Sequence, residues 1–311
     1  AGGVAGKAAA AWTIARAALQ TRAHMKGRKV ALLAGFGGYP SFAPALAAKS
    51  LGLPLLLHEQ ATRLSLANRQ LLRFADTVAI SFPKIDGMGG YEVARIVETG
   101  NPVRRVILNA RGAYPLIDDH GPLRLLAVGG SQSARVFGEV VPPALLALPD
   151  ELRRRLRLSL QYKGDNADAI AARLREAGVD ADIRPFFDDM GARLRDAHLV
   201  LTRAGATTIA DLLTVGRPAV FVPIPHGGSR EEQRGNAEAL VAAGAGWCLP
   251  EAQLTPERLS ELLAALFGHP ARLAAAAASA AGMAQPDAAG ALAEVVDMLL
   301  SERAATGRAT G

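Results

Sequence analysis

Short apolar runs alternate with amphipathic segments along most of the chain. Buried strands are predicted at 29–34, 54–58, 76–81, 123–128, 157–162, 180–187, 198–202, 218–225 and 246–250, with a strand running into a turn over 94–105. Helices are predicted at 7–26, 42–51, 66–75, 166–177, 208–215, 231–243, 255–267, 270–282 and 287–303, and one follows 129–134. Continuous apolar strands that alternate with helices are typical of parallel sheets covered on both faces.

The pattern forms two such series. The Pro-, Gly- and Asp-rich stretch AYPLIDDHGP (113–122) separates them and is typical of a linker. We therefore expect two doubly wound α/β domains that face a cleft, one over 1–112, joined by the helix 287–303, and one over 113–286. In such folds ligands bind at the carboxyl ends of the strands.

The amino-acid composition indicates which classes of binding partner are favoured. The 311 residues carry a formal charge of +6, which favours acidic partners such as phosphates or anionic lipid. Nucleic acid is disfavoured, because aromatic residues make up only 5% and no zinc-finger, RRM or KH pattern occurs. One cysteine, Cys248, excludes an intrachain disulfide and favours a reducing compartment. No aspartate group has the pattern of a metal site, so no metal is expected.

Two loops of the second series follow strands and open helices. GGSQSA (129–134) includes Ser131, and its small residues leave backbone N–H groups free for an anion, although a tight turn explains it equally well. RAGATTIAD (203–211) offers the N–H groups of Ala206 and Thr207 to a ligand, and Asp211 to a ribose diol. The alternative is a capping box formed by Thr208 and Asp211.

Two further candidates lie at strand ends of this series. In FFDDM, Phe187 offers a backbone hydrogen bond and an apolar wall for a flat base, or it packs in the core. In the segment 223–237, Gln233 and Asn236 are three residues apart, so they share a helical face. Amides there can contact sugar hydroxyls, or they belong to a solvated helix start.

The first series has its own polar strand ends. GFGGYPS (35–41) is a second anion-friendly loop, with Gly37, Gly38 and Tyr39 as acceptor-side candidates. His58 and Glu59 follow the next strand, in the pairing that proton transfer requires. Arg104, in GNPVR, offers a planar fork for a phosphate or carboxylate near the linker.

Taken in order, the motifs closely resemble the MurG family of peptidoglycan glycosyltransferases, from about residue 1 to 300. They are GFGGYPS, LGLPLLLHEQ, LANRQLLRFAD, GNPVR, GGSQSAR, FFDDM, RAGATTIADLLTVGRPAVFVPIPH and EEQRGNAEALVAAGA. The resemblance implies a GT-B fold and inverting transfer of N-acetylglucosamine from UDP-N-acetylglucosamine (UDP-GlcNAc) to the 4-hydroxyl of lipid I, giving lipid II. It also implies no cofactor and a peripheral position on the cytoplasmic face of the bacterial inner membrane.

The resemblance implies a role for each matching residue. Ser131 would lie at the diphosphate with Ala206 and Thr207, and Phe187 would hold uracil through its backbone. Asp211 would bind the ribose hydroxyls. Gln233 and Asn236 would contact the sugar, and Arg104 the donor from the hinge side. His58 and Glu59 remain candidates for acceptor-side chemistry.

The sequence also departs from the family pattern. Asp211 replaces Glu, Ala61 replaces Asn after HEQ, and Ser133 replaces Gly after GGSQ. The chain opens AGGVAGKAAA, without the family's first glycine-rich loop and its histidine, so we expect a processed or truncated first domain and slow or absent transfer. Two alternatives are an inactive nucleotide-sugar-binding fragment and a GT-B enzyme with another acceptor.

A basic segment opens the chain. Residues 7–29 combine Lys7, Arg16, Arg22, Lys26, Arg28 and Lys29 with Trp12, Ile14, Leu19 and Met25. Such a helix suits the surface of an anionic membrane, where lipid I would be embedded. A helix packed on the sheet with a solvated basic face is the alternative. No run of about 18 apolar residues, as a bilayer span requires, occurs.

Overall fold

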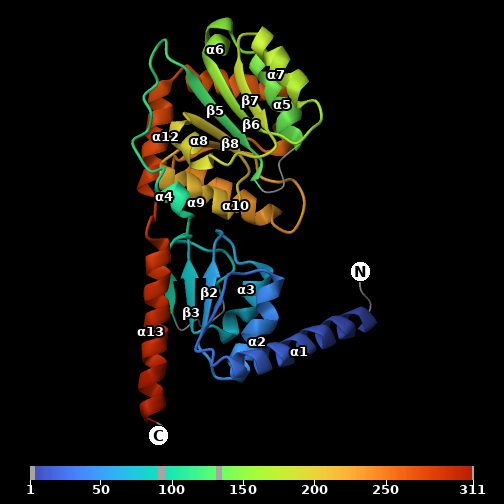
Figure 1. The fold of residues 1–311 in the computed structure, drawn as a ribbon, viewed down its shortest axis with the longest axis vertical. Coiled ribbons are helices and arrows are strands. Elements are labelled where there is room, and N and C mark those ends of the chain that lie inside the picture. Colours follow the sequence, from blue (N-terminus) through green and yellow to red (C-terminus); the bar gives the residue numbers. More distant parts are fainter. Residues whose placement is uncertain (1–3, 90–94, 131–134, 310–311) are drawn as a thin grey trace. The chain divides into compact units, whose positions relative to one another are not determined.

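The computed structural model describes residues 4–89, 95–130 and 135–309, and the chain divides into two compact units (Figure 1). Unit 1 comprises Ala1–Asn101 and Asp287–Gly311, and unit 2 comprises Pro102–Pro286. The boundary lies earlier than the predicted 112/113, because helix α4 (Arg105–Leu108) packs against α8 (Met190–Asp196) and α9 (Ala206–Val215) of unit 2.

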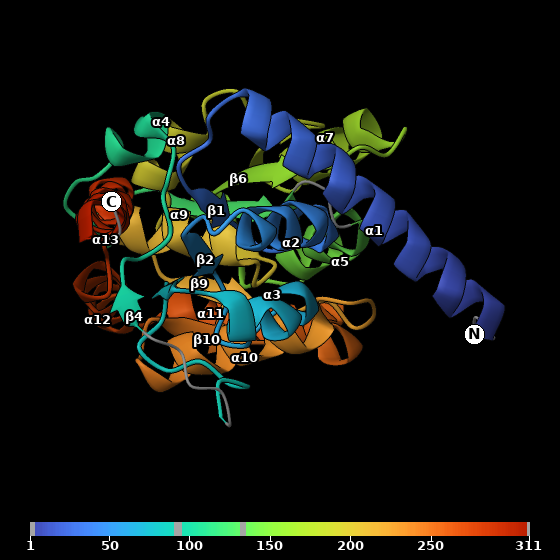
Figure 2. The ribbon, with the colours of Figure 1, turned by 90° about the horizontal axis from the view of Figure 1, so that it is seen from below.

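Unit 1 contains a four-stranded parallel sheet in the order β1-β2-β3-β4. The strands are β1 (Leu33–Gly35), β2 (Leu55–Glu59), β3 (Thr77–Ile80) and β4 (Ile96–Glu98). The helices are α1 (Val4–Gly27), η1 (Tyr39–Ser41), α2 (Phe42–Ser50), α3 (Leu66–Leu71), η2 (Leu72–Phe74) and α13 (Ala288–Ala309). In Figure 2, α1 lies beside α2, and its N-terminal part extends beyond α2.

Alternation along β2 gives unit 1 two apolar layers. Leu55 and Leu57 pack with Ala45 of α2 on one face, whereas Leu56 packs with Leu292 of α13 on the other. Successive strand side chains point to opposite faces, so a buried strand with apolar residues on both faces needs two covers. The C-terminal helix α13 supplies the second cover, and Arg95 of unit 1 pairs with Glu302 of α13 at 2.8 Å.

Unit 2 contains a six-stranded parallel sheet in the order β10-β9-β8-β5-β6-β7. Its strands are β5 (Leu123–Val128), β6 (Leu156–Gln161), β7 (Asp180–Arg184), β8 (Leu199–Thr202), β9 (Ala219–Phe221) and β10 (Gly246–Cys248). The remaining helices are α5 (Arg135–Leu146), α6 (Asp150–Arg155), α7 (Ala167–Glu176), α10 (Arg230–Ala242), η4 (Glu251–Gln253), α11 (Pro256–Phe267) and α12 (Pro270–Gly282). The strand order reverses beside β5, which is the position where doubly wound folds bind ligands.

Helices cover both faces of this sheet. The connections β5–β6–β7 run one way across the sheet and β7–β8–β9–β10 the other, so right-handed crossovers put α5 and α7 opposite α8 and α9. Helix α11 packs on α5, and α12 packs on α9. The predicted parallel α/β class is confirmed for both units, whereas the short helices α6 and α8 were not predicted.

One buried cation, Arg217, fixes the C-terminal end of α9. The Arg217 guanidinium, 1% exposed, donates to the carbonyls of Leu194, Val215 and Gly216, and also to those of Ala113 and Arg195. Helix C-termini leave carbonyls without intrahelical partners, and a guanidinium with five donors satisfies several at once. This residue therefore ties the ends of α8 and α9 to the segment that precedes β5.

Among the described residues, no single helix has the length and apolar composition to cross a bilayer. Helices α11 and α12 together have that length and composition, but they are bent by 89° relative to each other.

Candidate functional site

The amino end of α9 presents free backbone donors at the carboxyl end of β8. Gly205 is the N-cap, and the first intrahelical bond runs from Ile209 N to the Gly205 carbonyl at 3.0 Å. The N–H groups of Ala206, Thr207 and Thr208 therefore precede the helical ladder, and no side chain of the described residues caps them. Free N–H groups and the helix dipole together favour an anion such as a phosphate.

Asp211 lies one turn further along α9. Its carboxylate is buried, and among described residues Oδ1 has no hydrogen-bond partner. Oδ2 lies 3.5 Å from Nη2 of Arg104, the residue before α4, whose side chain is 64% exposed. Burial raises the pKa of Asp211 to about 6, although the charge and hydrogen bond of Arg104 act in the opposite direction. A buried carboxylate oxygen without a donor is costly, and a ligand hydroxyl would satisfy it.

The capping-box alternative for Thr208 and Asp211 is wrong. The helix begins earlier than the predicted residue 208, with Gly205 as N-cap, so Asp211 lies beyond the first turn. A capping box needs a side chain at the N-cap and a carboxylate three residues later. Glycine provides no such side chain, so Asp211 is not explained by helix capping.

Phe187 follows β7, and its ring and its backbone have different contacts. The residue is 2% exposed, and the Arg193 guanidinium lies over its ring at 3.9 Å from the ring centroid. The predicted apolar wall for a base is therefore wrong for this ring, which packs in the core. No hydrogen bond to the Phe187 N–H or carbonyl is found among the described residues. A free donor and a free acceptor on one residue suit the edge of a nucleobase.

The amides of α10 contact the neighbouring loops. Asn236 is buried, and its Nδ2 donates to the Ala204 carbonyl at 3.0 Å. Gln233 Oε1 accepts from Ile224 N at 3.2 Å. The Asn236 bond fixes the loop that carries Gly205 and the start of α9. That these amides contact a sugar stays a prediction.

Arg203, the first residue of RAGATTIAD, has a structural role at the end of β8. Its guanidinium donates to the Val222 carbonyl at 3.1 Å and pairs with Glu251 of η4. It thereby holds the end of β8 against the segments that follow β9 and β10. No role was predicted for Arg203, and its position at a strand end was the available signal. Ser131 lies outside the described residues.

In unit 1, Glu59 organises a loop. Its Oε1 accepts from Gln60 N at 3.0 Å and Ala61 N at 3.3 Å, and Oε2 from Ser65 N at 2.9 Å and Asn68 Nδ2 at 2.8 Å. With four donors around it, the carboxylate is fully used in structure. Glu59 therefore has a structural role, and these bonds argue against its predicted role in proton transfer, which stays a prediction.

His58 is buried beside it. Its Nε2 lies 2.8 Å from the Gly100 carbonyl, so this nitrogen carries the proton. Burial lowers the pKa of His58, and the Gly100 bond and the Glu59 charge act against that shift. The ring is therefore neutral at pH 7. At 1% exposure it does not reach a solvent-borne acceptor, which argues against the predicted role in proton transfer.

The loop that follows β1 lies next to Ser65 and Asn68, two residues that donate to Glu59. Gly37 and Gly38 have φ angles of 79° and 77°, which side chains rarely adopt. A Cβ on Gly37 would lie 3.5 Å from Ser65 Oγ. Tyr39 is exposed on the same loop. The three predicted acceptor-side residues therefore share one exposed loop, while their contact with an acceptor stays a prediction.

Known proteins match this chain over most of its length. The model of the glycosyltransferase family 28 C-terminal domain matches residues 124–292, and that of the N-terminal domain matches residues 2–80. A UDP-N-acetylglucosamine–N-acetylmuramyl-(pentapeptide) pyrophosphoryl-undecaprenol N-acetylglucosamine transferase from Rhodospirillum centenum is 43% identical, over 95% of this chain and 78% of its own length. The transferase of the same name from Methylobacterium sp. is 47% identical, over 86% and 72%. The crystal structure of Acinetobacter baumannii MurG is 33% identical with a TM-score of 0.76, over 93% and 80%.

Proposed function

Because the chain belongs to glycosyltransferase family 28, with the GT-B fold that was expected, we propose that it transfers N-acetylglucosamine from UDP-GlcNAc to the 4-hydroxyl of lipid I. Lipid I is the undecaprenyl-diphosphate-linked N-acetylmuramyl-pentapeptide, and the product, lipid II, serves peptidoglycan synthesis. The supporting observation is the amino half of α9, which carries free N–H groups and the Asp211 carboxylate, whose Oδ1 has no partner among the described residues. The high identity to the named transferases favours this function over an inactive fragment or another acceptor.

The donor's parts correspond to three features of unit 2. Its diphosphate suits the N–H groups of Ala206 and Thr207, and its ribose diol suits Asp211. Uracil presents an N–H donor beside a carbonyl acceptor, which complements the free carbonyl and N–H of Phe187. Main-chain groups that point at a ligand need no rearrangement on binding, which favours affinity.

The same groups can assist the chemistry. In an inverting transfer, the acceptor's 4-hydroxyl oxygen bonds to the anomeric carbon, the bond from that carbon to the phosphate oxygen breaks, and UDP leaves with the electron pair. Negative charge grows on the departing diphosphate, where the α9 dipole and N–H groups stabilise it. Arg104, exposed beside Asp211, adds a positive charge. The acceptor's hydroxyl proton passes to a base; the burial of His58 and the four hydrogen bonds of Glu59 argue against these two residues as that base.

Transfer to lipid I tests this function. With radiolabelled UDP-GlcNAc and lipid I in detergent micelles, we expect labelled, lipid-extractable product. UDP-glucose should be a poorer donor, because a site that binds a polar substituent discriminates against an analogue that lacks it. Binding of UDP-GlcNAc without transfer would favour the inactive-fragment alternative. Transfer only to a sugar acceptor other than lipid I would favour the alternative of a GT-B enzyme with another acceptor.

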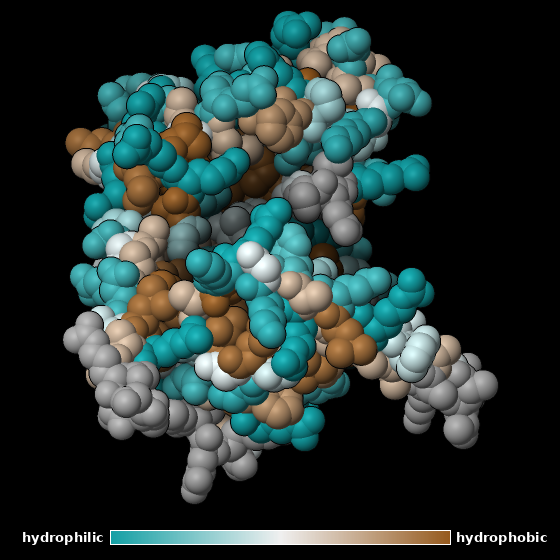
Figure 3. All heavy atoms as spheres, turned by 60° about the horizontal axis from the view of Figure 1, so that its bottom comes forward, coloured by the Kyte–Doolittle hydropathy of each residue, from teal (hydrophilic) through white to brown (hydrophobic). Residues whose placement is uncertain are grey.

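We infer further that α1 docks on anionic lipid at the cytoplasmic face, in keeping with an enzyme of cell-wall synthesis on which cell shape and division depend. Trp12 and Leu19 are 73% and 68% exposed, and exposed Arg16, Lys26 and Arg28 lie on or beside the same helix. Along the arm at the right of Figure 3, hydrophilic and apolar residues lie side by side. Exposed aromatic and basic residues together favour an interfacial helix.

Charge reversal tests the docking. Each basic residue near an anionic surface contributes about 1 kcal/mol, so Arg16→Glu with Lys26→Glu should weaken binding to phosphatidylglycerol-containing vesicles by at least about 30-fold. The matched control, Arg175→Glu with Arg272→Glu on unit 2, changes the net charge equally and should have little effect. Co-sedimentation at low salt measures both. Equal loss in the two variants would contradict docking through α1.

A further inference from the structure

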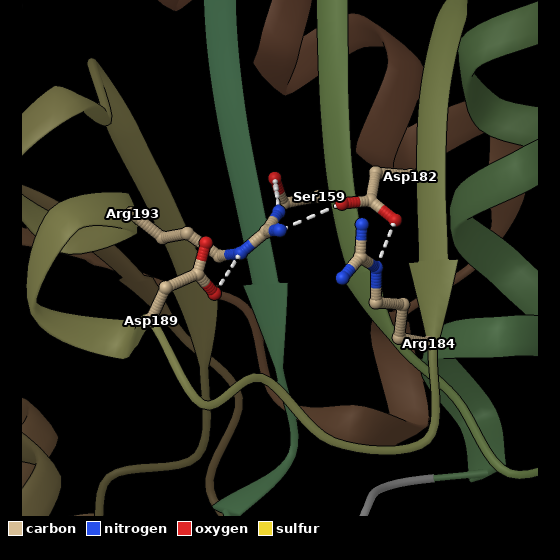
Figure 4. Close-up of polar contacts among 5 residues, drawn as sticks. All are labelled: Ser159, Asp182, Arg184, Asp189 and Arg193. Carbon is tan, nitrogen blue, oxygen red and sulfur yellow. Dashed lines mark hydrogen bonds and ion pairs between the residues drawn. The ribbon is translucent and has the colours of Figure 1, made fainter.

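Arg193 of α8 is the centre of a polar cluster that joins three elements of unit 2 (Figure 4). Its Nε donates to Asp189 Oδ1, its Nη1 to Ser159 Oγ and its Nη2 to Asp182 Oδ2, each at 2.7 Å. Ser159 belongs to β6, Asp182 to β7, and Asp189 is the N-cap of α8. Each of the three guanidinium nitrogens thus donates one hydrogen bond.

The guanidinium at the centre of the cluster is largely shielded from solvent and covers an aromatic ring, whereas the side chains of Asp182 and Asp189 are 35% and 54% exposed. The Arg193 side chain is 14% exposed, and its guanidinium lies 3.9 Å from the centroid of the Phe187 ring. A cation over a ring face is attracted to it, more strongly where water is excluded. Charge-assisted hydrogen bonds are also about twice as strong as neutral ones. Arg193 therefore fixes both the carboxylates and the ring.

These contacts restrain the loop between β7 and α8 at three points. Asp182 lies on the strand before the loop, Asp189 at its end, and Phe187 within it. With its ring held, Phe187 has restricted freedom to rotate its N–H and carbonyl, which are without partners among the described residues. A loop with a fixed backbone can present these two groups to a ligand in one orientation.

We propose that Arg193 is a positioning residue that sets the preference for uracil at the Phe187 backbone. The proposal rests on the proposed function, since it takes the ligand of unit 2 to be a uridine nucleotide. Uracil places an N–H opposite the carbonyl and a carbonyl opposite the N–H. Cytosine presents an acceptor nitrogen beside an amine, so against the same rigid peptide like groups meet. Discrimination is lost if the peptide can turn, because a binding site rejects an analogue only when its own polar groups would be left unpaired.

Three variants and two ligands test it. Arg193→Met keeps the chain length and removes the fork, Arg193→Lys keeps the charge, and Ser159→Ala removes one of the three bonds. The matched control is Arg184→Met, because Arg184 binds the same Asp182 at 2.7 Å but its side chain is 58% exposed (Figure 4). Calorimetric titration with UDP and with CDP gives the affinity ratio, and the melting temperature of each variant reports its folding.

We expect Arg193→Met to reduce the UDP-to-CDP affinity ratio about 10-fold, which corresponds to the loss of about one neutral hydrogen bond between the base and the Phe187 backbone. Ser159→Ala and Arg193→Lys should shift the ratio less but in the same direction, and Arg184→Met should leave it within about 2-fold. If Arg193→Met does not fold, the two milder variants decide. A folded Arg193 variant with the wild-type ratio, and a lower melting temperature alone, would overturn the proposal. Absence of UDP binding by the wild-type chain would instead contradict the proposed function.

Discussion

Glu59→Ala is expected to lower the free energy of opening of the 59–68 loop by about 3–5 kcal/mol. The substitution leaves the N–H groups of Gln60, Ala61 and Ser65 and the Asn68 amide without their acceptor. A buried donor without a partner costs about 1–3 kcal/mol, and entry of water offsets part of the sum. Hydrogen exchange at these backbone amides measures the effect, as an acceleration of at least about 100-fold.

Glu59→Gln distinguishes this structural role from proton transfer. Glutamine keeps the size of the side chain but puts an NH2 group against two donors, so we expect faster exchange and a lower melting temperature here too. A catalytic carboxylate would behave differently. A Glu59→Gln chain with wild-type exchange rates and no turnover would restore Glu59 as the base.

The pattern of the sequence predicts most of the fold, for a physical reason. Strands buried on both faces are continuous apolar runs, and LRLLAV and HLVLT needed no tertiary information to be found. Helix α8 was missed because it has only 7 residues and a polar composition, MGARLRD. The domain boundary was placed at a Pro- and Gly-rich stretch, but the contacts of α4 with α8 and α9 decide it, and they are not visible in composition.

The site was less predictable, since it depends on which polar groups already have partners. Sequence reasoning placed Asp211 and the α9 amino end at a strand end, where the structure has them. It could not show that Glu59 is surrounded by four donors, or that the Phe187 ring lies under Arg193. The spacing of Asp189 and Arg193, four residues apart, was the one signal for the Arg193 cluster.

Asp211→Asn is expected to stabilise the unliganded protein while it weakens nucleotide binding. Burial raises the folded-state pKa from 3.8 to about 6, so the folded state binds the proton more tightly than the unfolded state. The free energy of unfolding therefore falls as pH rises from about 4 to 6, by up to about 3 kcal/mol, and remains lower above that range. The variant should lose this pH dependence and gain about 1–3 kcal/mol at pH 7. Urea denaturation at pH 4, 5, 6 and 7 measures it, and equal slopes with pH for both proteins would contradict the burial argument.

We expect the Asp211 carboxylate, whose Oδ1 has no partner among the described residues, to hold a ribose diol near the amino end of α9. A double-mutant cycle with UDP and 2′-deoxy-UDP, titrated calorimetrically into the wild type and into Asp211→Asn, tests it most directly. If the carboxylate accepts from the 2′-hydroxyl, the wild type should prefer UDP by about 10-fold or more, since a hydrogen bond to a charged group contributes about 1.5–3 kcal/mol. In Asp211→Asn the preference should nearly vanish, while affinity for 2′-deoxy-UDP changes little. A preference for UDP that is the same in both proteins would contradict a hydrogen bond between the Asp211 carboxylate and the 2′-hydroxyl.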